Sequence, residues 1–259
     1  MLTDAELYAR ARDLVKYELS LFGESSPRSE LVILPGVVAC VNPDAPDRSL
    51  FNGAVGDSPA ELLDAYSTLE ARYAAAGVRA FMVWGDPGDE ALERELALRG
   101  HLLDGRPEAM GATIAELSLP PPEDLDWYET RDPRVVTRLN DVAYGYSAGA
   151  FASALTRLDD PRWRAYVARA GEHDRCCALT YESELGDCGI ACVATHPDAR
   201  RQGLASRLLS VAIAAAAERG ARTSSLQATK KGRGVYERLG FRAVGAMRMW
   251  ERRAPAPTS

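Results

Sequence analysis

The residues best suited to do chemistry lie in one basic turn, residues 195–209, with the sequence THPDARRQGLASRLL. Arg200 and Arg201 precede Gly203, and the Ala- and Leu-rich segment that follows predicts a helix beginning at the turn. A helix N-terminus exposes unpaired N–H groups and about half a positive charge, and glycine lets an anion approach the backbone. The turn therefore predicts a pyrophosphate site. It is neither a P-loop nor a Rossmann turn, because GKS, GKT and GxGxxG are missing.

A second segment, SLQATKKGRGVYERLGFRAVG, follows later in the chain. Together with CVATHPDARRQGLASRLL it resembles the GCN5-related N-acetyltransferase (GNAT) superfamily. That family has a strand, then (Arg/Gln)-x-x-Gly-x-(Gly/Ala), then a helix, and Arg200, Gly203 and Ala205 fall on this pattern. Tyr236 stands shortly before the Leu-Gly-Phe of the second segment. The resemblance covers residues 130–251.

The resemblance implies acetyl-CoA as co-substrate and no metal. The pantetheine arm would pair with the strand before the turn, and the pyrophosphate would lie on the turn itself. Thr229 would make a polar contact, and Arg233, with its neighbouring lysines, would meet the 3′-phosphate unless this is an ordinary solvated loop. The cofactor-binding residues implied in this way are Val193, Ala194, Thr195, Arg200, Arg201, Gln202, Gly203, Leu204, Ala205, Ser206, Thr229 and Arg233.

The resemblance also implies that a primary amine attacks the thioester directly and that Tyr236 protonates the leaving thiolate. A phenol is a donor at neutral pH, and a thiol has a pKa of about 8.5, so the role is chemically suitable. The alternative for Tyr236 is a packing residue on an amphipathic helix. The strand GIACVAT lacks the glutamate that many members use as general base. The nearest candidates are Glu182, Glu184, Asp187 and His196, and the base stays unassigned.

The composition limits the partners. The 259 residues carry a net charge of −6, which argues against nucleic acid as the main partner. Five cysteines, an odd number without metal-site spacing, are expected to be reduced thiols. The N-terminus lacks the apolar core of a signal peptide, and no apolar run reaches the roughly 18 residues of a membrane span. We expect a cytoplasmic protein without membrane contact.

Two domains must position these residues. Helical periodicity predicts helices at 3–21, 58–77, 88–100, 132–145, 204–219 and 232–240. Apolar and β-branched runs predict a strand pair or a bulged strand at 31–41 and strands at 78–84, 110–117, 163–170, 175–183, 188–195, 222–228 and 241–251. Three prolines at 120–122 form a stiff connector. We therefore predict domains at 1–120 and 123–253, with a flexible tail at 254–259.

The two halves repeat one pattern. Each has a helix, glycine and strand, then a second helix, glycine and strand, from Gly77 to Gly100 and from Gly220 to Gly240. A duplicated unit explains this order, although unrelated segments with glycine caps remain an alternative. The first half carries GDSPAE where the second carries RRQGLA, so it lacks the basic turn. We expect one CoA per chain, bound by the second half.

The sequence thus predicts an α/β (α+β) protein with two GNAT-like domains, each a mixed, mostly antiparallel twisted sheet flanked by helices. A splayed strand pair in the C-terminal domain would hold CoA, and the N-terminal domain would be non-catalytic. The expected activity is acetyl transfer to a small or amino-acid-like amine, by a monomer or homodimer. An acyl-CoA-binding sensor and a protein or peptide N-acetyltransferase are the alternatives. A loop and helix rich in aromatic residues, at 144–163, would line the acceptor pocket with Tyr144, Tyr146, Phe151 and Trp163, unless these side chains belong to the core.

Overall fold

A computed structural model describes residues 2–254 of the chain in two compact units. Within these residues, unit 1 joins the chain up to Leu14 to Glu108–Gly245, and unit 2 joins Val15–Pro107 to the chain from Ala246 on. The first helix, α1 (Asp4–Glu24), contributes residues to both. Apart from Ala254, the predicted flexible tail lies outside the described residues.

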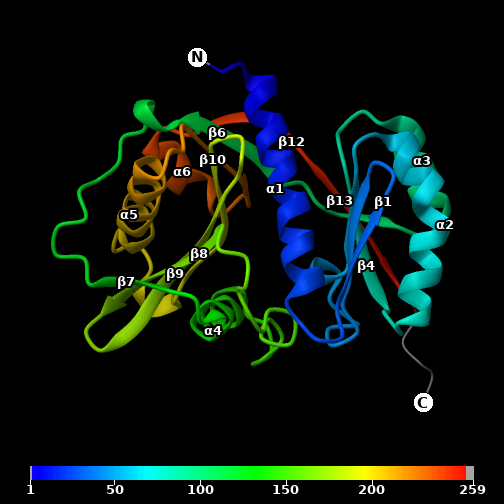
Figure 1. Ribbon diagram of the computed structural model, residues 1–259, viewed down its shortest axis with the longest axis horizontal. Coiled ribbons are helices and arrows are strands. Elements are labelled where there is room, and N and C mark those ends of the chain that lie inside the picture. Colours follow the sequence, from blue (N-terminus) through cyan, green and yellow to red (C-terminus); the bar gives the residue numbers. More distant parts are fainter. Residues whose placement is uncertain (1, 255–259) are drawn as a thin grey trace. The chain divides into compact units, whose positions relative to one another are not determined.

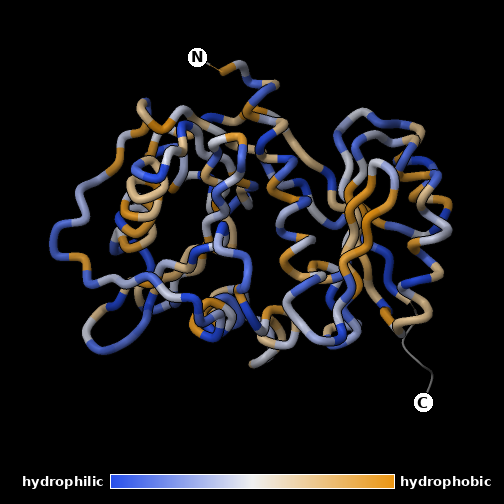
Figure 2. Tube along the Cα trace, viewed as in Figure 1, coloured by the Kyte–Doolittle hydropathy of each residue, from blue (hydrophilic) through white to orange (hydrophobic). Residues whose placement is uncertain are grey.

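Unit 2 is built on a six-stranded sheet with the order β1-β2-β3-β4-β13-β5. Its pairings are antiparallel except for that of β3 with β4, which is parallel. The strands β1 and β2 form the hairpin predicted around Pro35-Gly36, and it is apolar along much of its length (Figure 2). The elements are β1 (Glu30–Leu34), β2 (Val37–Val41), a 3-10 turn (Ser49–Phe51), β3 (Gly53–Gly56), α2 (Pro59–Ala75), β4 (Ala80–Gly85), α3 (Glu90–Leu98), β5 (Leu102–Gly105) and β13 (Arg248–Arg253).

Unit 1 contains a seven-stranded sheet with the order β12-β6-β11-β10-β9-β8-β7 (Figure 1). Strands β7 to β10 are antiparallel neighbours, whereas β10 and β11 run parallel. The elements are β6 (Glu108–Thr113), a 3-10 turn (Ile114–Glu116), β7 (Trp127–Thr130), α4 (Pro133–Tyr144), β8 (Trp163–Ala170), β9 (His173–Glu182), β10 (Asp187–Thr195), a 3-10 turn (Pro197–Ala199), α5 (Leu204–Glu218), β11 (Thr223–Ala228), α6 (Arg233–Leu239) and β12 (Arg242–Ala246). Two mixed sheets flanked by helices confirm the predicted fold class.

Each sheet includes one strand from the other half of the chain. Strand β6, from the first half, lies between β11 and β12, and β13, the last strand, lies between β4 and β5. The single strand predicted over 241–251 is therefore wrong, because the chain leaves one sheet after β12 and joins the other at β13. The predicted domains were contiguous, at 1–120 and 123–253, whereas each compact unit consists of two separate segments.

Several helices begin and end where the sequence signals indicate. Ser58 caps α2 by accepting from the Glu61 N–H at 3.3 Å, and Pro59 occupies the first turn. Asp132 caps α4 in the same way, and Gly145 ends it with a φ of 71°. The helix expected in the aromatic segment is not formed, since residues 145–162 consist of turns and irregular chain.

The sheet of unit 1 is covered on both faces. Leu208, Ala212 and Leu239 of α5 and α6 pack with Ile190 and Leu226 in one apolar core. On the opposite face, Leu7 and Leu14 of α1 lie close against Gly111 and Gly189, and α4 packs on β9 and β10. The strands β10 and β11 thus lie between two layers of helices.

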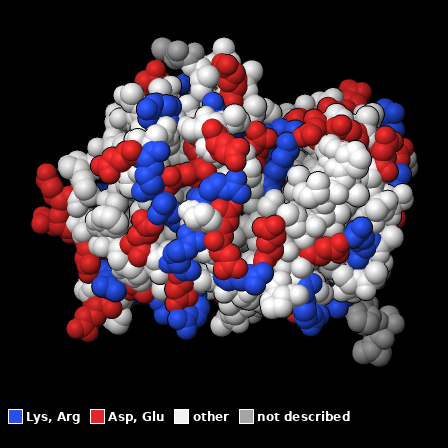
Figure 3. Space-filling view, in the orientation of Figure 1, with Lys and Arg blue, Asp and Glu red and all other residues white. Residues whose placement is uncertain are grey.

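The charged surface is mixed. On the face drawn in Figure 3, Lys and Arg side chains are interspersed with Asp and Glu. On that face, the described residues form no broad basic surface of the kind that binds nucleic acid. Among the described residues, no helix combines the length and apolar composition needed to cross a bilayer.

Candidate active site

The site begins where β10 and β11 separate. The two strands pair from Asp187 to Ile190, opposite Thr223 to Leu226, and then diverge. Beyond Ile190, β10 continues with β9 alone, and its register shifts between Ala191 and Ala194. A strand that loses one neighbour exposes backbone N–H and C=O groups along that edge. The predicted splayed pair is therefore present, and its open end lies at Val193, Ala194 and Thr195.

The closed end of the pair is held by a buried carboxyl group. Asp187 is 4% exposed and accepts hydrogen bonds from the hydroxyls of Thr223 and Ser225, each at 2.6 Å. Burial raises the pKa of Asp187, and the two hydroxyl donors oppose that rise. Because this carboxyl joins β10 to β11 at one end, it helps to confine the divergence of the strands to the other end.

A β-bulge shapes the open end. Cys192 has a φ of 51°, a left-handed conformation that is unfavourable for a residue with a side chain. The side-chain amide of Asn140 donates to the Cys192 carbonyl at 3.1 Å, and the Tyr144 hydroxyl donates to the Val193 carbonyl at 3.2 Å. Both donors belong to α4, and the sequence prediction missed Asn140 and Cys192. Their types carry no signal for a bulge, whereas the spacing of Asn140 and Tyr144 places them on one helix face.

The basic turn opens α5 as predicted. Gly203 is the N-cap, with a φ of 74° and no side-chain cap, and Arg201 is also left-handed, with a φ of 63°. A β-carbon at Gly203 would meet no atom within 4 Å. Over residues 201–207, the Arg207 N–H is the only one with a recorded main-chain acceptor, Gly203 O at 3.1 Å. The backbone from Arg201 to Ser206 thus presents a group of N–H donors at the positive end of a helix, which suits an anion.

The turn's side chains mainly fix its shape. The Arg200 guanidinium donates to the Ala143 carbonyl at 2.7 Å and to the Thr195 carbonyl at 3.3 Å. It therefore ties the turn to α4 and β10. Gln202 donates to the Asp198 carbonyl within the turn at 3.2 Å. Both arginines are exposed, and within residues 2–254 the Arg201 side chain makes no hydrogen bond or ion pair.

The remaining predicted cofactor residues are placed around this opening. Leu204 is buried in the core and Ala205 packs against that core. The Ser206 carbonyl accepts from the Ser210 hydroxyl. What these three residues can offer a ligand is therefore their backbone N–H groups. The Thr229 hydroxyl accepts from the Gly232 N–H at 3.2 Å, in the turn before α6. Arg233 pairs with Glu237 at 2.7 Å and with Glu108 at 3.1 Å. Two carboxylates therefore compete with a phosphate for that arginine.

Tyr236 projects from α6 into the same region. The residue is 8% exposed, and its ring packs edge-on against Phe241 with centroids 6.1 Å apart. Burial raises the pKa of Tyr236, and the neighbouring Tyr144 phenol adds to the rise. Desolvation also raises the pKa of Tyr144, although half of that residue's surface is exposed. Both phenols therefore stay protonated at neutral pH, as a proton donor must.

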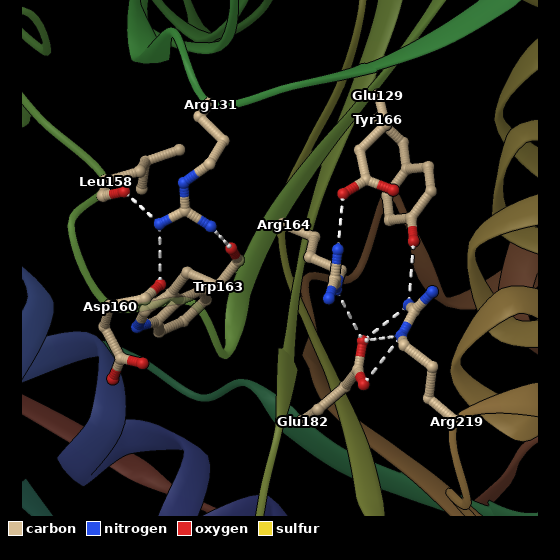
Figure 4. A network of polar contacts seen from close by, with 9 residues as sticks. All are labelled: Glu129, Arg131, Leu158, Asp160, Trp163, Arg164, Tyr166, Glu182 and Arg219. Atoms are coloured by element: carbon tan, nitrogen blue, oxygen red, sulfur yellow. Dashed lines mark hydrogen bonds and ion pairs between the residues drawn. The ribbon is translucent and has the colours of Figure 1, made fainter.

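The four general-base candidates have other roles or places. Glu182 pairs with Arg164 and Arg219 in the network of Figure 4, where Arg219 also donates to the Tyr166 hydroxyl at 3.1 Å. The Glu184 side chain is 89% exposed. Asp187 lies at the closed end of the strands, and His196 uses Nδ1 to accept the Asp198 N–H at 3.3 Å. None of the four is a free base at the open end.

A second group of contacts in Figure 4, separate from that of Glu182, orders part of the aromatic segment. Arg131 donates to the carbonyls of Leu158, Asp160 and Trp163, which fixes the chain before β8. Trp163 and Phe151 are each 2% exposed, so they belong to the core rather than to an acceptor pocket. Tyr144 is 50% exposed and stacks on Tyr146, with ring centroids 6.1 Å apart. Of the four predicted aromatic residues, this pair is the accessible part.

The donor set fits a ligand with a diphosphate and an amide-bearing arm. The open N-terminus of α5 supplies N–H groups for phosphate oxygens, and the adjoining edge of β10 supplies groups that pair with amides. Within the described chain, no group of three or more His, Cys, Asp or Glu side chains is arranged to hold a metal ion.

The comparisons with known proteins agree with this geometry. Residues 161–243 match the family model of the acetyltransferase (GNAT) domain. The fold resembles a GCN5-related N-acetyltransferase from Kribbella flavida, with a TM-score of 0.65 and 18% identity over 95% of this chain and 96% of that one. It also resembles one from Sphaerobacter thermophilus, with a TM-score of 0.53 and 16% identity over 99% and 96% of the chains. No curated protein sequence matches the chain.

Proposed function

The chain carries an acetyltransferase domain of the GNAT superfamily, and we propose that it transfers an acetyl group from acetyl-CoA to a primary amine of a small or amino-acid-like acceptor. The observation that carries the proposal is the open N-terminus of α5 beside the splayed end of β10. A helix start without a side-chain cap and a strand edge that has lost one neighbour adjoin there. These are the two features that a diphosphate-linked pantetheine requires.

Each part of the cofactor has a proposed partner in unit 1. The diphosphate binds the backbone N–H groups from Arg201 to Ser206, with Arg201 adding charge. The pantetheine arm pairs with Val193, Ala194 and Thr195. The open space beside Gly203 supports this arrangement, because a side chain there would project into the space an anion needs. When bound, acetyl-CoA supplies an activated acyl group and a thiolate leaving group.

Tyr236 is the proposed general acid. Its burial keeps the phenol protonated, and its hydroxyl can donate a proton to sulfur as the bond between carbonyl carbon and sulfur breaks. The amine nitrogen forms the new bond to that carbon and loses its own proton to solvent water. No side chain is assigned to this step, because the four candidates are engaged, exposed or remote.

Unit 2 is proposed to be non-catalytic. The start of its helix α2 is occupied by the protein's own groups, because the Ser58 hydroxyl caps it and donates to the Glu61 carboxylate. A second anion there would face that carboxylate. The chain is therefore expected to bind one CoA.

The decisive experiment measures thiol release from acetyl-CoA against a panel of amines, amino acids, aminoglycosides and peptides. Isothermal titration calorimetry runs in parallel, to obtain the affinity and the stoichiometry. We expect one site per chain and acceptor-dependent thiol release. Tight binding without release from any acceptor would favour the acyl-CoA sensor instead. Release with peptides alone would favour a peptide N-acetyltransferase, and absence of binding would overturn the proposal.

A further inference from the structure

Two consecutive carbonyl groups of the β10 bulge turn toward α4. Carbonyl groups of a strand normally lie in the plane of the sheet and accept from a neighbouring strand. At the bulge, the left-handed Cys192 breaks that pattern, and the carbonyls of Cys192 and Val193 instead accept from α4 side chains at 3.1 and 3.2 Å. The shape of the open strand thus depends on hydrogen bonds from outside the sheet.

The two donors form a matched pair on one helix. Asn140 and Tyr144 are four residues apart, so they lie one above the other on the same face of α4. Asn140 is 1% exposed and also donates to the Val136 carbonyl at 2.9 Å, which fixes its amide. Tyr144 is half-exposed and contacts Val193 at the outer end of the helix.

The end of α4 is itself held in place. Arg200 donates to the Ala143 carbonyl, a group that the helix end leaves without an intrahelical partner. Asp141 accepts from the N–H groups of Gly149 and Phe151 at 2.8 and 3.0 Å, which orders the following loop. The hydroxyl of Tyr144 therefore extends from a helix end whose position is fixed, and it can define the position of Val193.

We infer that Asn140 and Tyr144 are positioning residues that hold the bulge in the form that receives the pantetheine arm of CoA. The inference rests on the proposed function, because it concerns the strand edge assigned there to the cofactor. Asn140 sets the Cys192 peptide, and Tyr144 sets the Val193 peptide. Loss of either hydrogen bond lets the bulge relax toward an ordinary strand, which misplaces the groups that the arm would pair with.

The test compares the affinities of two ligands, both of which contact the turn and only one of which reaches the strand. CoA spans the turn and the strand, whereas 3′-phosphoadenosine 5′-diphosphate lacks the arm and contacts the turn alone. Tyr144→Phe keeps the ring and removes one hydrogen bond. We expect calorimetry to show a loss of affinity for CoA of about three- to tenfold, the effect of one neutral hydrogen bond. Affinity for the nucleotide should not change.

A matched control separates this effect from a general loss of stability. Tyr128→Phe removes another tyrosine hydroxyl from unit 1, one that donates to Asp174 at 3.0 Å, and it should leave both affinities unchanged. In turnover assays, Tyr144→Phe should raise the KM for acetyl-CoA more than it lowers kcat. Asn140→Ser, which shortens the buried donor, should weaken CoA binding in the same selective way if the variant folds.

The outcomes are distinguishable. If wild-type protein binds CoA and Tyr144→Phe changes both ligands equally, or neither, the positioning role is overturned while the proposed function stands. If wild-type protein binds the nucleotide but gains no affinity from the arm, the strand edge is not a pantetheine site and the inference fails. If wild-type protein binds neither ligand, the proposed function and the inference fail together.

Discussion

The helices α2 and α5 follow equivalent parallel strands in the two units, yet their N-termini differ. At α2, the Ser58 hydroxyl accepts the Glu61 N–H and donates to the Glu61 carboxylate at 2.9 Å. That carboxylate lies against Gly36, where a β-carbon would collide with it. At α5, Gly203 offers no side-chain cap and leaves open space. One unit neutralises its helix end with its own acid, and the other leaves the end free for a ligand.

The strands that precede these two helices also differ, because β3 is regular and β10 is bulged. β3 pairs with β2 without a register shift and with β4 along Gly53–Val55. β10 is bulged and loses β11 after Ile190. Three described non-glycine residues have positive φ, all in unit 1, and Cys192 and Arg201 are two of them. Unfavourable backbone conformations are thus concentrated in unit 1, and these two lie in its candidate site.

The helices that end before Gly100 and Gly240, α3 and α6, also differ. Aligning the left-handed glycines Gly100 and Gly240 places Leu96, which is fully buried, opposite Tyr236. Where unit 1 has a phenol near the open strands, unit 2 has only an apolar side chain. The two units thus differ in the polar groups at these positions.

The exchanged strands give the largest expected effect. Removing residues 246–259 deletes β13, which lies between β4 and β5, and should leave unit 2 unfolded. A fragment of residues 121–259 lacks β6 from the middle of the other sheet and should not fold alone. Circular dichroism and amide NMR dispersion would measure both. A folded, CoA-binding fragment 121–259 would instead support the contiguous domain from 123 to 253.

The next prediction concerns turnover. Tyr236→Phe should lower kcat by at least about tenfold, toward the 10²- to 10⁴-fold typical of general acids, with little change in acetyl-CoA affinity. Thiol release and calorimetry measure the two quantities. Tyr73→Phe is the control in unit 2, because its buried hydroxyl has no recorded partner among the described residues. Unchanged kcat in Tyr236→Phe would remove this tyrosine from the mechanism.

Low pH should lower the stability of unit 2, because a histidine is buried in its interior. His101 is 1% exposed, and burial lowers its pKa to about 4. In the unfolded chain its pKa is about 6.5, so between these values the unfolded state binds more protons. Stability should therefore fall as pH drops through this window, by up to about 3 kcal/mol.

Urea unfolding at several pH values would measure this effect. His101→Gln should show a shallower loss of unfolding free energy between pH 6.5 and 4 than the wild type. His173→Gln, at the exposed start of β9, should retain the wild-type slope. Equal slopes in all three proteins would mean that His101 does not titrate as expected.

The smallest effect tests the N-terminus of α5, with Gly77, just beyond the C-terminus of α2, as the control position. Gly203 and Gly77 have similar φ values, 74° and 71°, and a β-carbon at either would meet nothing within 4 Å. Gly203→Ala and Gly77→Ala should each lower the unfolding free energy by about 1 kcal/mol, the cost of a left-handed residue. Only Gly203→Ala should also weaken acetyl-CoA binding, by about tenfold, a further 1.4 kcal/mol. Equal affinities in both variants would contradict the diphosphate site.

Much of the fold was predictable from local signals. Caps such as Ser58 and Asp132, the glycine stops and the apolar periodicity located most of the helices and strands, because these features act over a few residues. The turn at Gly203 and the helix of Tyr236 were located for the same reason. The short strands β3, β5 and β7 were missed, since runs of four residues carry little periodicity.

The sequence by itself determined most of the elements, the mixed-sheet class and the basic turn, all of which depend mainly on neighbours along the chain. Only the tertiary structure decided that β6 and β13 exchange sheets, because strand pairing depends on contacts far apart in sequence. It alone revealed the left-handed Cys192 and its carbonyl held by Asn140, 52 residues away. A bulge of this kind is stable only when distant donors compensate its unfavourable backbone.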